Sequence, residues 1–312
     1  MAGTLAFPVC DRSCGNMTTR SPLTGVLLML AAMAVLPFLD VVAKTLGQQN
    51  VPVLQIVWAR MMFGALLSMP FALRHAGVRG LIPDQPMVHV LRAALLMTAT
   101  FCFFAALKTL PIADALAIFF VNPLVVTALS PLVLGEHVGP RRWAAVAMGF
   151  AGTLIIIRPG FQAINTGIIL AFVAGCALAL YFLMTRRMAG SNPAMVTTYF
   201  TSITGAVTLS AAIPLVWLTP TPGQWGMFVL IGLFATLGHY LIVRAYDFAE
   251  ASLLAPLAYT EMIMAVVVGW YFFGDFPDAW TFLGVSILIG SAIYISMRER
   301  LRSHGQGRPA GG

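Results

Sequence analysis

Two polar side chains lie in the middle of long apolar stretches. Asn122 lies nine residues into the run 113–134, and Glu261 lies nine residues into the run 252–273. Nine residues of helix rise about 14 Å, which is close to half of a hydrocarbon core roughly 30 Å thick. A charged side chain at this depth costs about 2.5–3.5 kcal/mol on insertion scales and generally marks a pathway. Because desolvation favours the neutral form, Glu261 is also a candidate proton carrier.

Asn122 is followed by Pro123, which has no backbone N–H to bond the carbonyl of Phe119. Inside a membrane that carbonyl needs another partner, from protein or from water. We therefore expect an unwound turn whose backbone polar groups lie beside the Asn122 amide. The alternative is that Asn122 bonds a neighbouring helix and that Pro123 only kinks its own helix.

Three charged residues lie within or at the end of the first two apolar runs. Asp40 and Lys44 are spaced i,i+4, and Arg60 lies about a third of the way into the second run. We expect an Asp40–Arg60 pair, or a cluster of all three, that neutralises these charges. It is either a static clamp between two helices or an outer binding site or gate, since a guanidinium suits carboxylate and phosphate groups.

Aromatic and imidazole groups complete the set of candidates. Tyr181 and Tyr259 are suited to stacking on a flat substrate or to plain packing, and His239 either titrates near neutral pH or bonds a neighbour. The candidate substrate-binding residues are Asn122, Glu261, Tyr259, Arg60, Tyr181, His239 and Tyr240. The candidates for proton coupling or gating are Glu261, Asp40, Lys44, Glu136 and Asp275. We expect no metal site, no cofactor and no catalytic residues.

The elements that must position these residues are membrane helices. The chain is 59% hydrophobic and 9% charged, with a mean hydropathy of +0.88, whereas soluble domains are about 45–50% apolar and about 25% charged. The net charge of +7 includes no basic run of the kind that binds nucleic acid. Apolar runs predict ten spans at 23–43, 53–73, 88–108, 113–134, 142–157, 166–185, 195–217, 226–243, 252–273 and 280–297.

The distribution of basic residues orients these spans. With the N-terminus inside, fourteen arginines (Arg92 among them) fall on the cytoplasmic side and Lys44, Lys108 and Arg158 outside. This bias predicts an even number of spans in a bacterial inner membrane, with cytoplasmic tails at 1–22 and 299–312. No cleavable signal pattern precedes the first span, and Met17 is an alternative start to Met1.

The two halves of the chain repeat one another, over 23–158 and 165–298. Five spans per half is an odd number, so the second half enters the membrane upside down, as in many secondary transporters. At offsets of 139 to 142 residues the matches include LTGVLL (23–28) with NTGIIL (165–170), Lys44 with Arg186, Pro52 with Pro193, Gly64 with Gly205, LGE (134–136) with FGD (273–275), and Asn122 with Glu261. We therefore expect Asn122 and Glu261 at a site on the pseudo-two-fold axis.

The pattern resembles the drug/metabolite transporter superfamily, EamA type, a ten-span 5+5 fold. The matching stretches include WARMMFGALL, FFAALKTLPIADALAIFFVNPLVVTALSPLVLGE, AVAMGFAGTLIIIRPG and RAYDFAEASLLAPLAYTEMIMAVVVGWYFFGDFPD. HVLRAALLM and the stretch from APLAYTE to FGDFPD also resemble the subgroup that takes up S-adenosylmethionine and riboflavin. The resemblance implies an all-α integral membrane protein that transports a small molecule.

Function is therefore expected to be secondary transport of a small organic metabolite by alternating access, by a monomer or homodimer in the lipid bilayer. The substrate is amino-acid-like, or a cofactor or vitamin such as S-adenosylmethionine or riboflavin. An efflux permease of the same fold is the alternative, because direction depends on gradients. An intramembrane enzyme is disfavoured because HExxH and GxSxG are lacking, and a channel or scramblase because nothing resembles a filter.

Overall fold

The computed structural model describes residues 22–110, 112–136, 138–157 and 166–274, and beyond these the positions 279–280, 282–284, 286–287 and 290. Every regular element in these ranges is helical. The α-helices are α1 (Pro22–Gln48), α2 (Val53–Ala76), α3 (Pro86–Ala106), α4 (Ile112–Phe119), α5 (Asn122–Leu134), α6 (Pro140–Ile157), α7 (Thr166–Arg187), α8 (Ala194–Ser210), α9 (Pro222–Phe248), α10 (Ala251–Leu254) and α11 (Thr260–Phe273). Short 3₁₀ turns are η1 (Arg79–Leu81), η2 (Ile213–Leu215) and η3 (Ala255–Tyr259).

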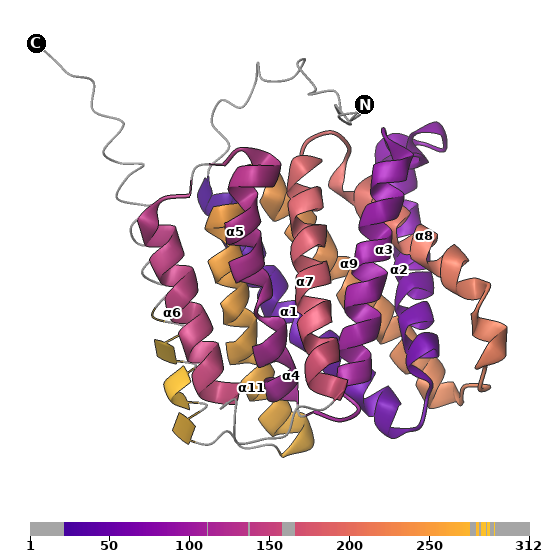
Figure 1. Ribbon diagram of the computed structural model, residues 1–312. Helices are drawn as coiled ribbons and strands as arrows, with labels where there is room; N and C mark the ends of the chain where they lie inside the picture. Colours follow the sequence, from indigo (N-terminus) through magenta and orange to yellow (C-terminus); the bar gives the residue numbers. More distant parts are fainter. Residues whose placement is uncertain are drawn as a thin grey trace, which may run out of the picture.

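The helices stand side by side in one bundle, with α6 at one end and α2 and α8 at the other (Figure 1). Within the described ranges, six segments are long and apolar enough to cross a membrane: Pro22–Gln48, Val53–Ala76, Pro86–Ala106, Ala115–Leu134, Thr166–Arg187 and Pro222–Phe248. Leu257–Phe273 is a shorter apolar helix. Most of the expected tenth span, 280–297, lies outside the described residues.

Two of the expected spans are broken, and they are the two that carry Asn122 and Glu261. The run 113–134 forms α4, a two-residue turn and then α5, which begins at Asn122. The run 252–273 forms α10, the 3₁₀ turn η3 and then α11, which begins at Thr260. Discontinuous helices at equivalent positions of two repeats are the usual frame of a transport site, because they expose backbone polar groups at mid-depth.

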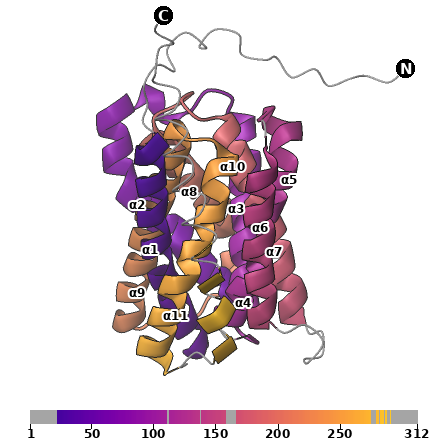
Figure 2. The same cartoon turned by 90° about the vertical axis from the view of Figure 1, so that its left-hand side faces the viewer.

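The repeat is visible in the local backbone. α5 is capped at its C-terminus by Gly135 and α11 by Gly274, both in the left-handed region with φ of 69° and 71°. Each glycine donates its N–H to a carbonyl four residues earlier, Pro131 or Trp270. The chain rises from α4 to α5 and descends from α10 to α11 (Figure 2). The two halves therefore run in opposite directions, as an inverted repeat requires.

The packing between helices also reflects the repeat, because a helix pair in contact has an equivalent pair in contact. α1 packs along α9 as α7 packs along α3, and α2 crosses α8, its own equivalent. At this crossing a Cβ on Gly64 would lie 3.2 Å from Ser202 Oγ, and one on Gly205 would lie 2.9 Å from Met61 Cγ. The contacts are reciprocal at an offset of 141 residues, so the pseudo-two-fold axis passes between α2 and α8. Small residues allow this close approach.

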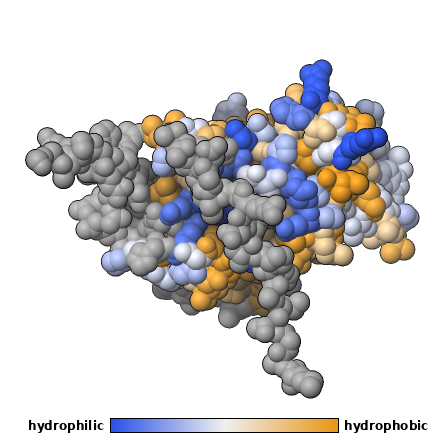
Figure 3. Space-filling view, turned by 90° about the horizontal axis from the view of Figure 1, so that it is seen from above, coloured by the Kyte–Doolittle hydropathy of each residue, from blue (hydrophilic) through white to orange (hydrophobic). Residues whose placement is uncertain are grey.

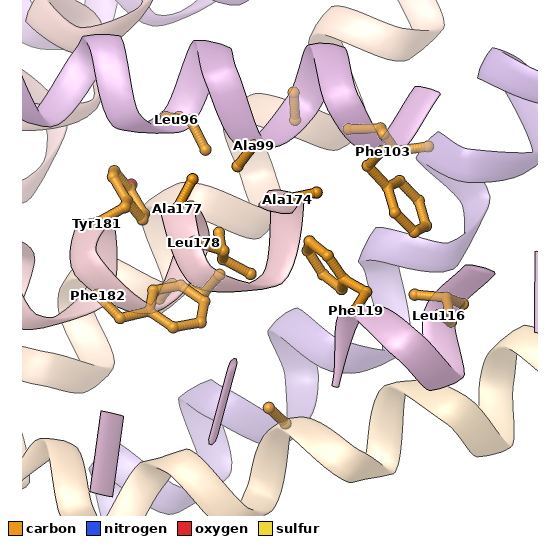
Figure 4. Packing of buried hydrophobic residues seen from close by; sticks show 14 of the residues in the cluster. Leu96, Ala99, Phe103, Leu116, Phe119, Ala174, Ala177, Leu178, Tyr181 and Phe182 are labelled. Carbon is orange, nitrogen blue, oxygen red and sulfur yellow. The ribbon is translucent and has the colours of Figure 1, made fainter. Parts of the chain in front are cut away.

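The core between the halves is apolar, and so is much of the outer surface. Leu96 and Ala99 on α3 face Ala177 and Leu178 on α7 (Figure 4). On the outside, Leu132 and Tyr271 are 82% and 79% exposed. On the end of the bundle that is uppermost in Figure 1, hydrophilic residues occupy the face and hydrophobic residues lie along its margin (Figure 3). Large exposed hydrophobic side chains around the flanks are expected of a surface that contacts lipid.

Candidate functional site

A central cavity lies between the two halves, beside both helix breaks. It offers about 70 Å³ to the centres of water-sized molecules. Its polar lining consists of Asp40, Arg60, Thr100, Asn122, His239 and Glu261, and aromatic rings such as Phe103, Phe119 and Phe182 line the rest. Five of the residues proposed from the sequence are thus brought together at one place.

The lining obeys the pseudo-two-fold axis. Residues at equivalent positions of the two halves face the cavity in pairs: Leu36 with Leu178 and Asp40 with Phe182 at an offset of 142, and Thr100 with His239, Phe103 with Ile242, Phe119 with Ala258 and Asn122 with Glu261 at an offset of 139. The positions are symmetric but the chemistry is not, because each charged member faces an uncharged partner. The polar groups that line the cavity are therefore arranged asymmetrically about the axis.

Asn122 fills the gap that Pro123 makes in the hydrogen bonding of the chain. Its Nδ2 donates to the Phe119 carbonyl oxygen at 3.0 Å, and this is the carbonyl that Pro123 leaves without a helical donor. Gly175 of α7 lies against the break, where a Cβ would be 2.5 Å from the Phe119 oxygen. Asn122 Oδ1 is buried with no hydrogen-bond partner among the described residues. The amide thus has one structural hydrogen bond and one unused acceptor.

Glu261 lies in the first turn of α11 and is 7% exposed. Asp40 of α1 is 5% exposed and close enough for the two carboxylates to repel one another when both are charged. Neither has a hydrogen bond or ion pair within the described ranges, and both line the cavity. Two acids that share a small cavity disfavour double ionisation.

The expected Asp40–Arg60 ion pair is not formed. Arg60 donates through Nη1 to Thr100 Oγ1, and its Nη2 lies 2.6 Å from His239 Nε2. No carboxylate of the described chain comes within 4.0 Å of it. Lys44 is also directed elsewhere, with its Nζ 4.5 Å from the centre of the Phe273 ring. Arg60 and Asp40 instead face the same cavity, because Thr100 and His239 occupy both terminal nitrogens of the guanidinium.

The contact with Arg60 defines the state of His239. A guanidinium has no acceptor, so His239 Nε2 must accept, and the neutral ring carries its proton on Nδ1. Nδ1 lies 3.3 Å from Tyr181 Oη, which gives the proton an acceptor. Behind this group is a small side cavity, lined by Arg60, Met61, Leu96, Tyr181, Thr198, Thr201, Ser202, Ala235 and His239. Arg60 and His239 therefore separate two adjacent spaces.

Tyr259 and Tyr240 are not among the residues that line either cavity. Tyr259 is fully buried, packs edge-on against Phe120, and donates to the Phe120 carbonyl at 3.5 Å. Its ring takes the space that a Cβ on Gly149 would need. Tyr240 is half-buried on α9. Tyr259 packs beside the helix break instead of facing the central cavity.

A cluster of polar contacts joins four helices at the end of the bundle where α5 finishes. Arg186 Nε lies 3.3 Å from Glu136 Oε1, and Arg186 Nη1 donates to the Tyr246 carbonyl at 2.6 Å. Glu136 also accepts the backbone N–H of Ala251 at 3.1 Å. These contacts tie the ends of α5 and α7 to α9 and α10. We call them the inner latch, after the orientation expected from the basic residues. The predicted counterpart of Glu136, Asp275, lies outside the described residues.

Sequence reasoning missed Arg92, which it counted with the arginines on the cytoplasmic side. Arg92 is 0% exposed on α3 and donates to Thr185 Oγ1 at 3.1 Å, to the Thr197 carbonyl at 2.9 Å, and to Thr201 Oγ1. Its guanidinium carbon lies 5.2 Å from the centre of the Tyr181 ring. The available signal was its position in the stretch HVLRAALLM, where one full turn of apolar residues follows it.

These features define a class of protein: a helical membrane transporter with an inverted repeat and a cavity on the axis that relates its halves. The chain belongs to the EamA-like transporter family, which matches it twice, over residues 23–158 and 165–297. Members have ten membrane spans, and the chain is a small-molecule transporter of this family.

Relatives cover most of the chain. The riboflavin transporter of Rhizobium johnstonii is 29% identical over 89% of this chain and 92% of its own length. The S-adenosylmethionine uptake transporter of Rickettsia bellii is 25% identical over 84% and 89%. The pseudopaline exporter of Pseudomonas aeruginosa is 26% identical over 89% and 97%. A solved crystal structure, 21% identical, superposes with a TM-score of 0.75 over 90% of this chain and all of that chain. The expected resemblance to the riboflavin and S-adenosylmethionine subgroup is confirmed.

Proposed function

We propose that the chain carries a small polar metabolite across the bacterial inner membrane by alternating access around the central cavity. The observation that carries this proposal is the pairing of equivalent residues around one cavity between two antiparallel halves. A site on the pseudo-two-fold axis is reached equally from either side when the halves rock.

Glu261 is the first candidate for proton coupling, and Asp40 is the second. Both acids are buried and face the cavity beside Arg60. A substrate that pairs with Arg60 changes the local field and therefore the ease with which the carboxylates bind protons. Asn122 Oδ1, Arg60, His239 and Tyr181 are the proposed substrate contacts. Tyr259 and Tyr240 are better placed to support the helices that carry these groups.

Gating follows from the repeat. In the proposed topology the inner latch, Glu136 with Arg186, closes the cytoplasmic side. At offsets of 139 and 142 residues the equivalent sequence positions are Asp275, which lies outside the described residues, and Lys44. We propose that these two pairs open in alternation, with both termini in the cytoplasm and the five-helix repeats 23–158 and 165–298 as the moving units.

The substrate class is bounded by the relatives and by the lining. Riboflavin and S-adenosylmethionine are both polar heterocyclic metabolites, and the names of two relatives contain them. Phe103, Phe119 and Phe182 supply apolar faces for such a ring system, and Arg60 and Glu261 supply opposite charges. Export of a metabolite is the second candidate, and the exporter among the relatives favours it.

Reconstitution in liposomes tests transport itself. A thermal-shift screen of the purified protein against vitamins, nucleosides and amino acids first identifies a ligand, because a ligand that binds the folded state raises the unfolding temperature. Saturable counterflow of that ligand is the expected result. Non-saturating flux would indicate a channel, and chemical conversion of the ligand would indicate an enzyme. Either outcome would overturn the proposal.

A further inference from the structure

The buried core of the described chain holds two guanidiniums and two carboxylates. The buried charged or titratable polar residues of the described chain are Asp40, Arg60, His89, Arg92, His239 and Glu261. His239 is neutral because its Nε2 accepts from Arg60, and the two acids disfavour ionising together. Both acids line the central cavity together with Arg60, whereas the acceptors of Arg92 in the described chain are all uncharged.

Among the described residues, Arg92 has no anionic partner. Its acceptors are two threonine hydroxyls and one backbone carbonyl, all uncharged, and its buried Nε has no partner among the residues described. A buried cation without a counter-ion is costly even when neutral dipoles solvate it. A carboxylate or phosphate would bond the same planar group more strongly, through two charge-assisted hydrogen bonds.

A second unused group lies next to Arg92. His89, three residues earlier on α3, is 0% exposed, and both of its ring nitrogens lack a hydrogen-bond partner in the described chain. Its ring packs edge-on against Phe200 at 5.9 Å and is close enough to Arg92 to interact electrostatically. A buried imidazole with two unused nitrogens is rare in a folded protein, because buried polar atoms are nearly always bonded.

The Arg92 cluster adjoins the side cavity. Thr201 accepts a hydrogen bond from Arg92 and also lines that cavity, together with Arg60, Thr198 and Ser202. Tyr181 connects the same two places, with its hydroxyl at His239 and its ring face at Arg92. Hydroxyl groups thus lie between the two guanidiniums, while Met61, Leu96 and Ala235 supply the apolar part of the side-cavity lining.

We propose that Arg92, with His89 and Thr201, forms a second binding site for anionic groups, which receives the carboxylate or phosphate of a transported molecule. The proposal rests on the transport function and deepens it, because it assigns the substrate a carboxylate or phosphate. Arg92 exchanges the Thr201 hydroxyl for the anion, and the anion gives the buried guanidinium its missing counter-charge. Arg60 and Arg92 then act in sequence on the same group of the substrate.

Anion binding by the purified full-length protein tests this site. Thermal unfolding is followed while acetate or inorganic phosphate replaces chloride at constant ionic strength. We expect both anions to raise the unfolding temperature of the wild type in a saturable manner. Arg92→Gln should raise the anion concentration at half-saturation by about tenfold or more, which is the loss of affinity expected for one charge-assisted interaction. Arg92→Lys should retain part of the effect, and the exposed Arg74→Gln is the matched control.

The outcomes are decisive in each arm. No anion effect on the wild type, or an equal effect on Arg92→Gln, overturns the proposal. If Arg92→Gln does not fold, acetate binding is measured on the His89→Ala variant, which retains Arg92. Weaker acetate binding by this variant supports the site, and unchanged binding overturns it. An effect of phosphatidylglycerol without one of acetate or phosphate would assign the site to lipid and overturn the substrate role. Counterflow is measured in parallel to separate failure of the anion site from failure of the transport proposal. If only the anion site is wrong, counterflow persists. If transport itself is wrong, counterflow is absent.

Discussion

The Asn122 amide nitrogen donates a 3.0 Å hydrogen bond to the Phe119 carbonyl oxygen. The adjacent Pro123 removes the backbone donor that would otherwise bond this carbonyl. Pro123 interrupts the helix, and the Asn122 side chain supplies the hydrogen-bond donor that the Phe119 carbonyl loses. The Asn122 side-chain oxygen remains buried and unpaired within the described chain. The opposite half has Glu261 at the equivalent position, beside a break of the same kind.

The first prediction separates these two roles of Asn122. Asn122→Ala leaves the buried Phe119 carbonyl unpaired and should destabilise the protein by about 1–3 kcal/mol. In the double variant Asn122→Ala, Pro123→Ala, the new backbone N–H at position 123 can donate to that carbonyl, so stability should return. Binding of the ligand found by thermal shift should not return, because the side-chain oxygen is absent.

Thermal unfolding and ligand titration of the same three proteins check this prediction. Pro123→Ala alone provides the control for the effect of removing the proline. Full recovery of both stability and binding in the double variant would contradict a role for the Asn122 oxygen in the site.

The second prediction concerns Glu261. Glu261→Gln keeps the size and polarity of the side chain but removes the proton site, so transport driven by a pH gradient should fall to the leak rate while exchange at equal pH persists. The variant should still insert and purify like the wild type. Uptake into proteoliposomes with and without a pH gradient measures this, and Glu250→Gln, an exposed acid before α10, is the control. Unchanged transport with unchanged pH dependence would refute the assignment.

The third prediction tests the inner latch. Glu136→Gln weakens the contact with Arg186 and should favour opening at the cytoplasmic side. In a protein without its native cysteines, Ala258→Cys places a thiol in the cavity lining. An impermeant thiol reagent added from the cytoplasmic side should label it about fivefold faster, as expected for loss of about 1 kcal/mol. The charge exchange Glu136→Arg, Arg186→Glu restores the ion pair but not the bonds to Ala251 and Tyr246, so it should slow labelling only in part. Equal rates in all three proteins would exclude a gate here.

Much of the fold was predictable from the chain because the repeat is local. Gly135 and Gly274 each end a helix in the left-handed region, and such glycines are readable from LGE and FGD at matched offsets. Depth alone placed Asn122 and Glu261 near one another, since nine residues of helix bring each to the same level from opposite faces. The proline at 123 correctly indicated the break in the first half. The break around Ala255–Tyr259 has its proline at 256, which was given no role.

The pairing of charges was not predictable, because it depends on which helices meet. Arg60 was matched with Asp40, its nearest opposite charge in the sequence, but bonds Thr100 and His239 from helices far along the chain. Arg92 was treated as a topology signal, since a single arginine near a span end has the same pattern whether it faces water or the core. Only the packing of α3 on α7 and α8 buries it.

The last prediction concerns the closest backbone approach at the site. A Cβ on Gly175 would lie 2.5 Å from the Phe119 oxygen and 2.7 Å from Val121 Cγ1, so Gly175→Ala must push α7 away from the helix break or displace the carbonyl that Asn122 bonds. We expect a destabilisation of about 1–3 kcal/mol, typical of overpacking, together with weaker ligand binding. Gly269→Ala on α11 is the matched control, because nothing lies within 4 Å of its Cβ position and alanine is the better helix former. Thermal unfolding and ligand titration of both variants measure the difference, and an equal response would mean that the approach of α7 to the break has no part in shaping the site.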